Sequence, residues 1–139
     1  AKQLVERLIK YDVPVWLVNT GWTGGPYGVG NRMNINHTRN MVRAAINGDL
    51  QNAEFVVDPI FKFEVPTHGP GVPDEVLTPR RTWADKDAFD AQVAKLAYMF
   101  AQNFEYYKEG VTPEVAAAGP VVPENVDTSN LRFSKPGEG

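Results

Sequence analysis

The chain has 139 residues, with 14 basic and 17 acidic side chains and a formal net charge of −3. This length suits one compact domain, and the acidic balance argues against a nucleic-acid partner, whose phosphates require many Lys and Arg side chains. The sequence holds no cysteine and no apolar run of membrane-spanning length, so it predicts neither disulfides nor thiolate chemistry nor a membrane segment.

The first ten residues predict an amphipathic helix, because their apolar positions share one helical face. Since this periodicity is already present in the first turn, we expect the chain to be cut from a longer protein. The apolar residues 13–18 then predict a buried strand. A helix that leads into such a strand indicates an α/β fold, a mixed sheet with flanking helices.

A glycine-rich loop follows, with five of the twelve glycines between residues 21 and 30. Asn34 is well placed to cap a helix whose apolar stripe runs to Ile46, and Asn47-Gly48 supplies its stop. The central unit is therefore predicted as strand, glycine loop and helix.

The middle of the chain is rich in turn signals. Two β-prone stretches, residues 55–57 and 60–65, flank a turn at Asp58-Pro59. Four prolines between residues 66 and 81 predict an irregular surface connection.

The clearest helix is predicted from about Asp85 to Lys108, with acidic residues in its first turns. Thr112-Pro113 can start one more turn. Residues 121–139 contain few large apolar groups and predict an extended or disordered tail beyond a folded segment over residues 1–120.

The sequence lacks the residue patterns of the common catalytic sites. The only serines, Ser129 and Ser134, lie in the predicted tail, and His37 and His68 stand 31 positions apart without a ligand motif beside them. We therefore assign no catalytic residue and no metal ligand, and interpret each histidine as a capping or surface group.

The glycine loop is the most informative feature for binding. Its spacing matches neither of the common phosphate-binding motifs, so a tightly turned loop without a ligand stays an open alternative. Arg32, Met33 and Thr38 follow it with a guanidinium, a polarizable thioether and a hydroxyl, which suit a purine ring and its sugar. In the alternative interpretation without a ligand, Arg32 is a solvated residue, Met33 is a core residue and Thr38 is a residue of the helix start.

Residues 15–33, VWLVNTGWTGGPYGVGNRM, closely resemble the C-terminal region of ATP-dependent phosphoenolpyruvate carboxykinases. The resemblance continues through residues 52–55, 58–61 and 82–85 and into the long helix, so it covers about residues 1–120. It implies that residues 1–120 are the C-terminal segment of the nucleotide-binding lobe of that fold.

The resemblance implies a carboxy-lyase of gluconeogenesis that converts oxaloacetate and ATP to phosphoenolpyruvate, ADP and CO₂ with Mg²⁺ and Mn²⁺. The family's phosphate loop, metal ligands and substrate arginines lie upstream of the matching region. What transfers is the adenosine side of the ATP site, Arg32, Met33 and Thr38, while Asn31 replaces a lysine that the family usually carries. We therefore expect this chain to be inactive alone and to need the remainder of the parent polypeptide as its partner.

Two other interpretations stay open. The chain could be a non-catalytic module that binds a nucleotide or another anion, or an interaction element whose apolar patches self-associate. Because the C-terminal residues carry no microbody signal, the cytoplasm is the expected location.

Overall fold

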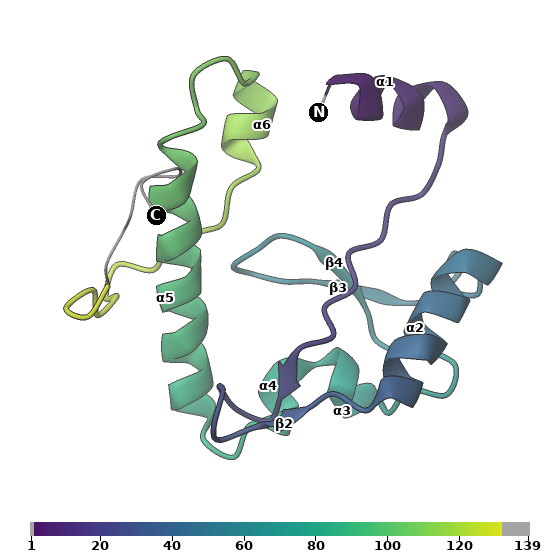
Figure 1. Cartoon of the computed structure of the whole chain (residues 1–139), viewed down its shortest axis with the longest axis horizontal. Coiled ribbons are helices and arrows are strands. Elements are labelled where there is room, and N and C mark those ends of the chain that lie inside the picture. Colours follow the sequence, from purple (N-terminus) through teal and green to yellow (C-terminus); the bar gives the residue numbers. More distant parts are fainter. Residues whose placement is uncertain (1, 132–139) are drawn as a thin grey trace.

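The computed structural model describes residues 2–131, which form helices and two small antiparallel sheets (Figure 1). In Figure 1, α5 and α2 stand on opposite sides of the β3–β4 hairpin. The helix α1 lies at the top of this view, as does α6. The helices are α1 (Lys2–Tyr11), α2 (Ile35–Asn47), α3 (Asp74–Leu77), α4 (Pro79–Thr82), α5 (Lys86–Phe104) and α6 (Pro113–Ala117). The strands are β1 (Trp22–Thr23), β2 (Asn31–Arg32), β3 (Phe55–Val57) and β4 (Glu64–Pro66).

The α/β character is confirmed in a coarse sense, but the expected single mixed sheet is wrong for residues 2–131. They form two separate two-stranded sheets, β1 with β2 and β3 with β4, and both pairs are antiparallel. Residues 13–18, predicted as a buried strand, belong to neither sheet. A strand requires a neighbouring backbone with which to exchange hydrogen bonds, and among the described residues the only such bond of this segment joins the amide of Val13 to the carbonyl of Leu8 in the preceding helix.

The helix α2 confirms its predicted ends. The side chain of Asn34 accepts a hydrogen bond from the amide of Asn36 at 2.9 Å, which satisfies one free donor of the first turn. At the other end, Gly48 adopts a left-handed φ of 80° and its amide binds the carbonyl of Ala44. Asn40 then ties α2 to the turn before α3 by donating to the carbonyl of Gly71 at 2.8 Å.

The turn at Asp58 is confirmed, because its carboxylate accepts from the amides of Ile60 and Phe61 at 2.9 and 2.6 Å. The second strand is shorter and later than predicted, Glu64–Pro66 instead of residues 60–65. The irregular connection over residues 66–81 is also wrong in part, because α3 and α4 form there. Acidic residues open α3 and a proline opens α4, and both stabilise a helical first turn.

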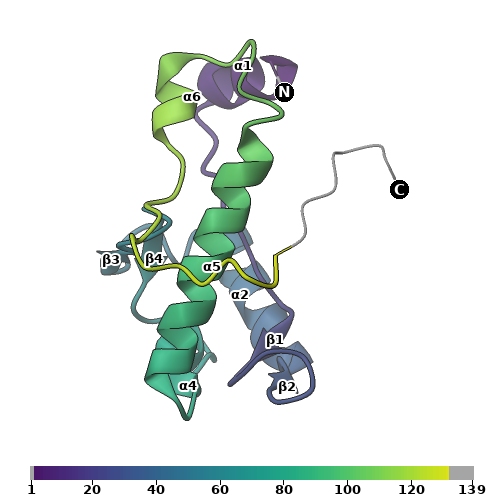
Figure 2. The same ribbon diagram turned by 90° about the vertical axis from the view of Figure 1, so that its left-hand side faces the viewer.

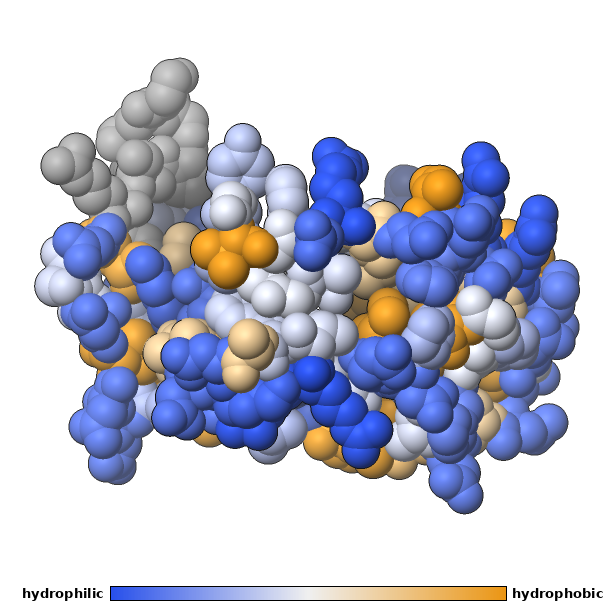
Figure 3. Space-filling model, turned by 90° about the horizontal axis from the view of Figure 1, so that it is seen from below, coloured by the Kyte–Doolittle hydropathy of each residue, from blue (hydrophilic) through white to orange (hydrophobic). Residues whose placement is uncertain are grey.

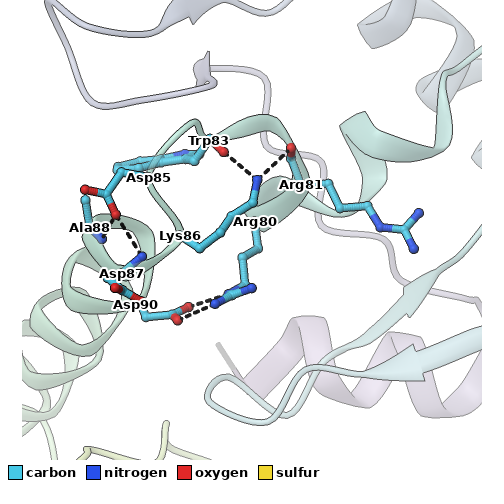
Figure 4. A network of polar contacts seen from close by, with 8 residues as sticks. All are labelled: Arg80, Arg81, Trp83, Asp85, Lys86, Asp87, Ala88 and Asp90. Carbon is cyan, nitrogen blue, oxygen red and sulfur yellow. Dashed lines mark hydrogen bonds and ion pairs between the residues drawn. The ribbon is translucent and has the colours of Figure 1, made fainter.

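A network of polar contacts joins α4 to the start of α5 (Figure 4). Asp85 caps α5 by accepting from the amides of Asp87 and Ala88 at 3.0 and 2.9 Å. The guanidinium of Arg80 donates two hydrogen bonds, each of 2.8 Å, to Asp90, and these bonds lower the pKa of that carboxyl. The helix therefore begins directly after Asp85, close to the predicted start, although it ends at Phe104, short of Lys108.

The helix α6 confirms the predicted turn at Thr112, whose hydroxyl accepts from the amide of Val115. Residues 121–131 carry no helix or strand and cross one face of α5 (Figure 2). The amide of Val121 donates to the carbonyl of Ile60 at 2.8 Å. The rest of the predicted tail, residues 132–139, lies outside the described residues, so the division into a folded segment and a tail stays a prediction.

Few side chains are fully enclosed. The buried hydrophobic residues of the described chain are Ala44, Leu50, Val72 and Ala97. Aromatic pairs join α5 to its neighbours: Phe61, in the turn between β3 and β4, meets Phe100 of α5, and Trp83 meets Phe89 at the start of the helix. The core is therefore a set of small contacts between neighbouring elements.

Candidate functional site

The predicted binding residues lie where the β1–β2 hairpin enters α2. In this hairpin Trp22 is opposite Arg32, and Thr23 is opposite Asn31. The amides of Val29 and Gly30 both donate to the carbonyl of Pro26, at 3.0 and 2.9 Å, and close the glycine-rich loop. The loop therefore sets the position of Arg32.

Gly25 and Gly30 permit the two sides of the loop to approach closely. A Cβ at Gly30 would lie 2.5 Å from the carbonyl oxygen of Gly25 and 2.6 Å from that of Thr23. A Cβ at Gly25 would lie 2.8 Å from the nitrogen of Gly30. These distances are too short for any side chain, so the packing of the loop by itself requires glycine at both positions.

Thr82, at the end of α4, fixes the hairpin to the second half of the chain. Its hydroxyl oxygen accepts from the amide of Gly24 at 3.1 Å and from the hydroxyl of Thr23 at 3.3 Å, and it donates to the carbonyl of Pro79 at 2.7 Å. With two bonds accepted and one donated, the hydroxyl uses its full capacity. Thr82 is thereby bonded to Gly24, 58 positions earlier in the chain, and to Thr23, 59 positions earlier.

The three predicted residues follow the hairpin in order. Arg32 is exposed on β2, Met33 is half-buried and donates its amide to the carbonyl of Gly21 at 3.0 Å, and Thr38 is half-buried in the first turns of α2. Within residues 2–131, neither the guanidinium of Arg32 nor the hydroxyl of Thr38 has a hydrogen bond or an ion pair. Two side chains with strong bonding capacity are therefore free at one helix start.

The chain segment that contains this helix start carries only positive formal charges. Residues 13–48 contain three arginines and no acidic side chain, although the whole chain has a net charge of −3. The first turn of α2 likewise has no acidic residue. The partial positive charge of a helix N-terminus adds to that of Arg32, so this segment can attract an anionic group.

Two aromatic rings flank the hairpin. Trp22 and Tyr27 meet edge to face with 5.1 Å between ring centroids. Trp22 is still 43% exposed and lies opposite Arg32, so its fluorescence can report on a ligand at this position.

The histidines do not join the site in a common cluster. His68 is exposed, and its Nδ1 lies 2.9 Å from a carboxylate oxygen of Asp74. His37 lies in the first turn of α2, where its Nδ1 is buried without a hydrogen-bond partner among the described residues. Over residues 2–131 no three His, Asp or Glu side chains come together in a way that could hold a metal ion.

Sequence reasoning proposed Arg32, Met33 and Thr38 as binding residues, and that stays a prediction, but it gave no sign of the contacts of Thr82. Its neighbours predict only the start of a helix, and the contact with Gly24 bridges 58 positions.

Among residues 2–131, no helix is long and apolar enough to cross a membrane.

Comparison with known proteins places these features in a family. The family model described as phosphoenolpyruvate carboxykinase matches residues 1–75, which include the hairpin and all of α2. The chain is 57% identical over 122 residues to phosphoenolpyruvate carboxykinase (ATP) 2 of Moorella thermoacetica, a match that covers 88% of this chain. It is 54% identical over 120 residues to phosphoenolpyruvate carboxykinase (ATP) of Thermus thermophilus, which covers 86% of it.

Each match covers only a part of the relative's own length. The chain spans 23% of the length of both the Moorella and the Thermus protein. About three-quarters of each relative therefore has no counterpart in these 139 residues.

Proposed function

This chain belongs to the phosphoenolpyruvate carboxykinase family, and we propose that it supplies the adenosine side of the ATP site in a longer ATP-dependent enzyme. That enzyme would convert oxaloacetate and ATP to phosphoenolpyruvate, ADP and CO₂. The chain would form the C-terminal segment of the nucleotide-binding lobe, and the remainder of the polypeptide would be its partner. The cytoplasm, where these soluble metabolites occur, is the proposed location.

The observation that carries this proposal is the pair of unpartnered groups at the start of α2. Arg32 offers a planar cation that can stack on a ring or bind an oxygen, and Thr38 offers a hydroxyl that both donates and accepts. Met33, which lies between them in the sequence, is half-buried and offers an apolar, polarizable surface. These three groups suit a purine and its ribose, and the positive surroundings suit the attached phosphates.

The described residues do not fit Mg²⁺ or Mn²⁺, because no cluster of three metal-binding side chains occurs among them. Divalent cations prefer several oxygen ligands at once. We therefore propose that the metal ligands lie in the remainder of the enzyme.

The test of this proposal uses a chimera in which the chain replaces its matching region in the Moorella thermoacetica relative. We expect the chimera to form phosphoenolpyruvate, and the 139-residue chain alone to form none. In the chimera, Arg32→Ala should raise KM for ATP more than KM for oxaloacetate. Arg43→Ala, which removes an exposed arginine further along α2, is the matched control and should change neither.

Equal effects of Arg32→Ala on both KM values would refute the adenosine assignment, and turnover by the isolated chain would refute its dependence on the missing polypeptide. A titration of the chain with ATP, followed by tryptophan fluorescence, addresses the alternative of a non-catalytic module. Binding at micromolar ATP by the isolated chain would favour that module, because the free groups at α2 would then suffice as a complete site.

A further inference from the structure

The helix α2 carries Thr38, but little packing holds this helix in place. Within residues 2–131, α2 makes no extensive contact with another helix or strand, and Ala44 is its only buried residue. Figure 3 views the molecule from below, the side on which β2 and α3 lie in Figure 1, and shows hydrophobic side chains at the surface in separate patches among hydrophilic ones. Individual polar contacts therefore have a large share in fixing the orientation of α2.

One polar contact joins α2 to a distant part of the chain. The side-chain amide of Asn40, which is half-buried, donates to the carbonyl of Gly71 at 2.8 Å across 31 positions. Among the described residues it is the only hydrogen bond from α2 to a segment beyond the two ends of the helix. A Cβ at Gly71 would lie 2.5 Å from the Nδ2 of Asn40, so the amide packs directly on the backbone.

The turn that receives this bond, residues 68–74, is closed by bonds of its own. The amide of Val72 donates to the carbonyl of Gly69 at 3.1 Å, and the side chain of Val72 is only 7% exposed. The Nδ1 of His68 lies 2.9 Å from a carboxylate oxygen of Asp74, so the two ends of the turn are linked as well. The turn therefore offers the helix an acceptor at a fixed position.

The same part of the chain also holds the β1–β2 hairpin. The helices α3 and α4 follow the turn and pack against each other, and Thr82 at the end of α4 bonds to the glycine-rich loop. Arg32, on the hairpin, and Thr38, on α2, are thus attached to one frame, residues 68–82. The hairpin is attached through Thr82 and the helix through Asn40.

Asn40 and Thr38 lie on nearly opposite sides of α2. Two positions along an α-helix correspond to about 200° around its axis and about 3 Å along it. The bond at Asn40 therefore limits rotation of the helix, and the hydroxyl of Thr38 moves with any rotation that occurs. At a side-chain radius of about 5 Å, a rotation of about 20° displaces this hydroxyl by about 1.7 Å, which is enough to break a hydrogen bond to a ligand.

We propose that Asn40 is a positioning residue of the nucleotide site: its bond to Gly71 sets the rotation of α2 and thereby the direction in which Thr38 faces the nucleotide. Asn40 acts through the helix and has no contact of its own with the nucleotide. This inference rests on the proposed function, in which Thr38 binds the adenosine part of ATP.

Steady-state kinetics of the chimera with the Moorella relative provide the first test. Asn40→Ala and Asn40→Leu both lack the donor and should raise KM for ATP about 3- to 10-fold, the effect of about one hydrogen bond, while kcat and KM for oxaloacetate stay unchanged. Asn47→Ala is the matched control, because Asn47 is exposed on the same helix and its side chain has no hydrogen bond among the described residues. An unchanged KM for ATP in both Asn40 variants, or an equal rise in Asn47→Ala, would overturn the inference.

The choice between two purine nucleotides separates positioning from a general loss of stability. The ratio of kcat/KM for ATP to kcat/KM for GTP should fall at least about threefold in Asn40→Ala, as it should in Thr38→Val, because a displaced hydroxyl no longer contacts the correct purine. General loosening would lower both values equally. A lowered ratio in Thr38→Val with an unchanged ratio in Asn40→Ala would overturn this inference and leave the proposed function intact. An unchanged KM and ratio in Thr38→Val would refute the proposed function itself.

Gly71→Ala changes the same bond from its other side. The new Cβ would displace the amide of Asn40, so this variant should raise KM for ATP as Asn40→Ala does. The double variant should show no larger KM than the single ones, because both changes remove one shared interaction. Increases that multiply in the double variant would show that the two residues act independently, which would overturn the inference.

Discussion

Gly30 provides the sharpest test of how the loop positions Arg32. In Gly30→Ala the new Cβ would lie 2.5 Å from the carbonyl oxygen of Gly25, 2.6 Å from that of Thr23 and 2.7 Å from the nitrogen of Gly25. All three neighbours are backbone atoms, so no side chain can rotate to relieve the overlap. The pairing of β1 with β2 must shift instead.

Overpacking of this kind costs about 1–3 kcal/mol, and three simultaneous backbone overlaps place Gly30→Ala in the upper half of that range, at about 2–3 kcal/mol. If this cost falls on the hairpin, local opening becomes about 30- to 150-fold more frequent. The amide of Met33, which binds the carbonyl of Gly21 at 3.0 Å, is the reporter. Its hydrogen exchange, measured by NMR in the 139-residue chain, should accelerate by that factor.

Two other glycines of the same loop are internal controls. A Cβ at Gly21 would meet only the side-chain oxygen of Asn19 at 3.6 Å, an ordinary contact, so Gly21→Ala should leave the exchange rate almost unchanged. Gly28 has open space but a left-handed φ of 86°, so Gly28→Ala should cost about 1 kcal/mol through backbone strain. An unchanged rate for Met33 in Gly30→Ala, or a reversed order of the three variants, would refute the reasoning.

Three further predictions concern the contacts around α4 and α5. Thr82→Val leaves the amide of Gly24 without its acceptor, so in the chimera KM for ATP should rise by up to about tenfold while kcat is retained, and Thr82→Ser should restore KM; an equal defect in Thr82→Ser would contradict a role for the hydroxyl. Asp85→Ala removes the cap of α5 and should lower the free energy of unfolding by about 1 kcal/mol in denaturant titrations, whereas Asp85→Asn should retain most of it. Because Arg80 lowers the pKa of Asp90, the stabilisation by this pair is complete above the ordinary pKa of an aspartate and is lost as the pH falls through the lowered value; NMR titration of the Asp90 carboxyl should show the lowered midpoint, and Arg80→Ala should return it to the ordinary range.

Local signals were sufficient for the helices with strong caps. Asn34 and Gly48 define the ends of α2, and Asp85 defines the start of α5, through bonds that join residues at most four positions apart. Such bonds depend on the residue type and the local backbone alone, so the sequence reveals them. The turn at Asp58 belongs to the same class.

The sequence also provided the three candidate site residues, because they follow one another across a single hairpin and helix. Their chemical types and their resemblance to a family were visible before any fold was known. Their role in binding ATP stays a proposal. What the structure adds is that Arg32 and Thr38 have no partner within residues 2–131, which no sequence pattern could predict.

Sequence alone determined the composition, the capped helices and the family resemblance, since each depends on neighbouring residues or on residue order. Tertiary structure alone decided that Thr82 holds Gly24 across 58 positions and that Gly25 and Gly30 approach too closely for a side chain. It also decided that residues 13–18 are not a strand here, despite their apolar pattern. The physical reason is that a strand is completed by hydrogen bonds to a second backbone, and the position of that backbone is not encoded in the segment itself.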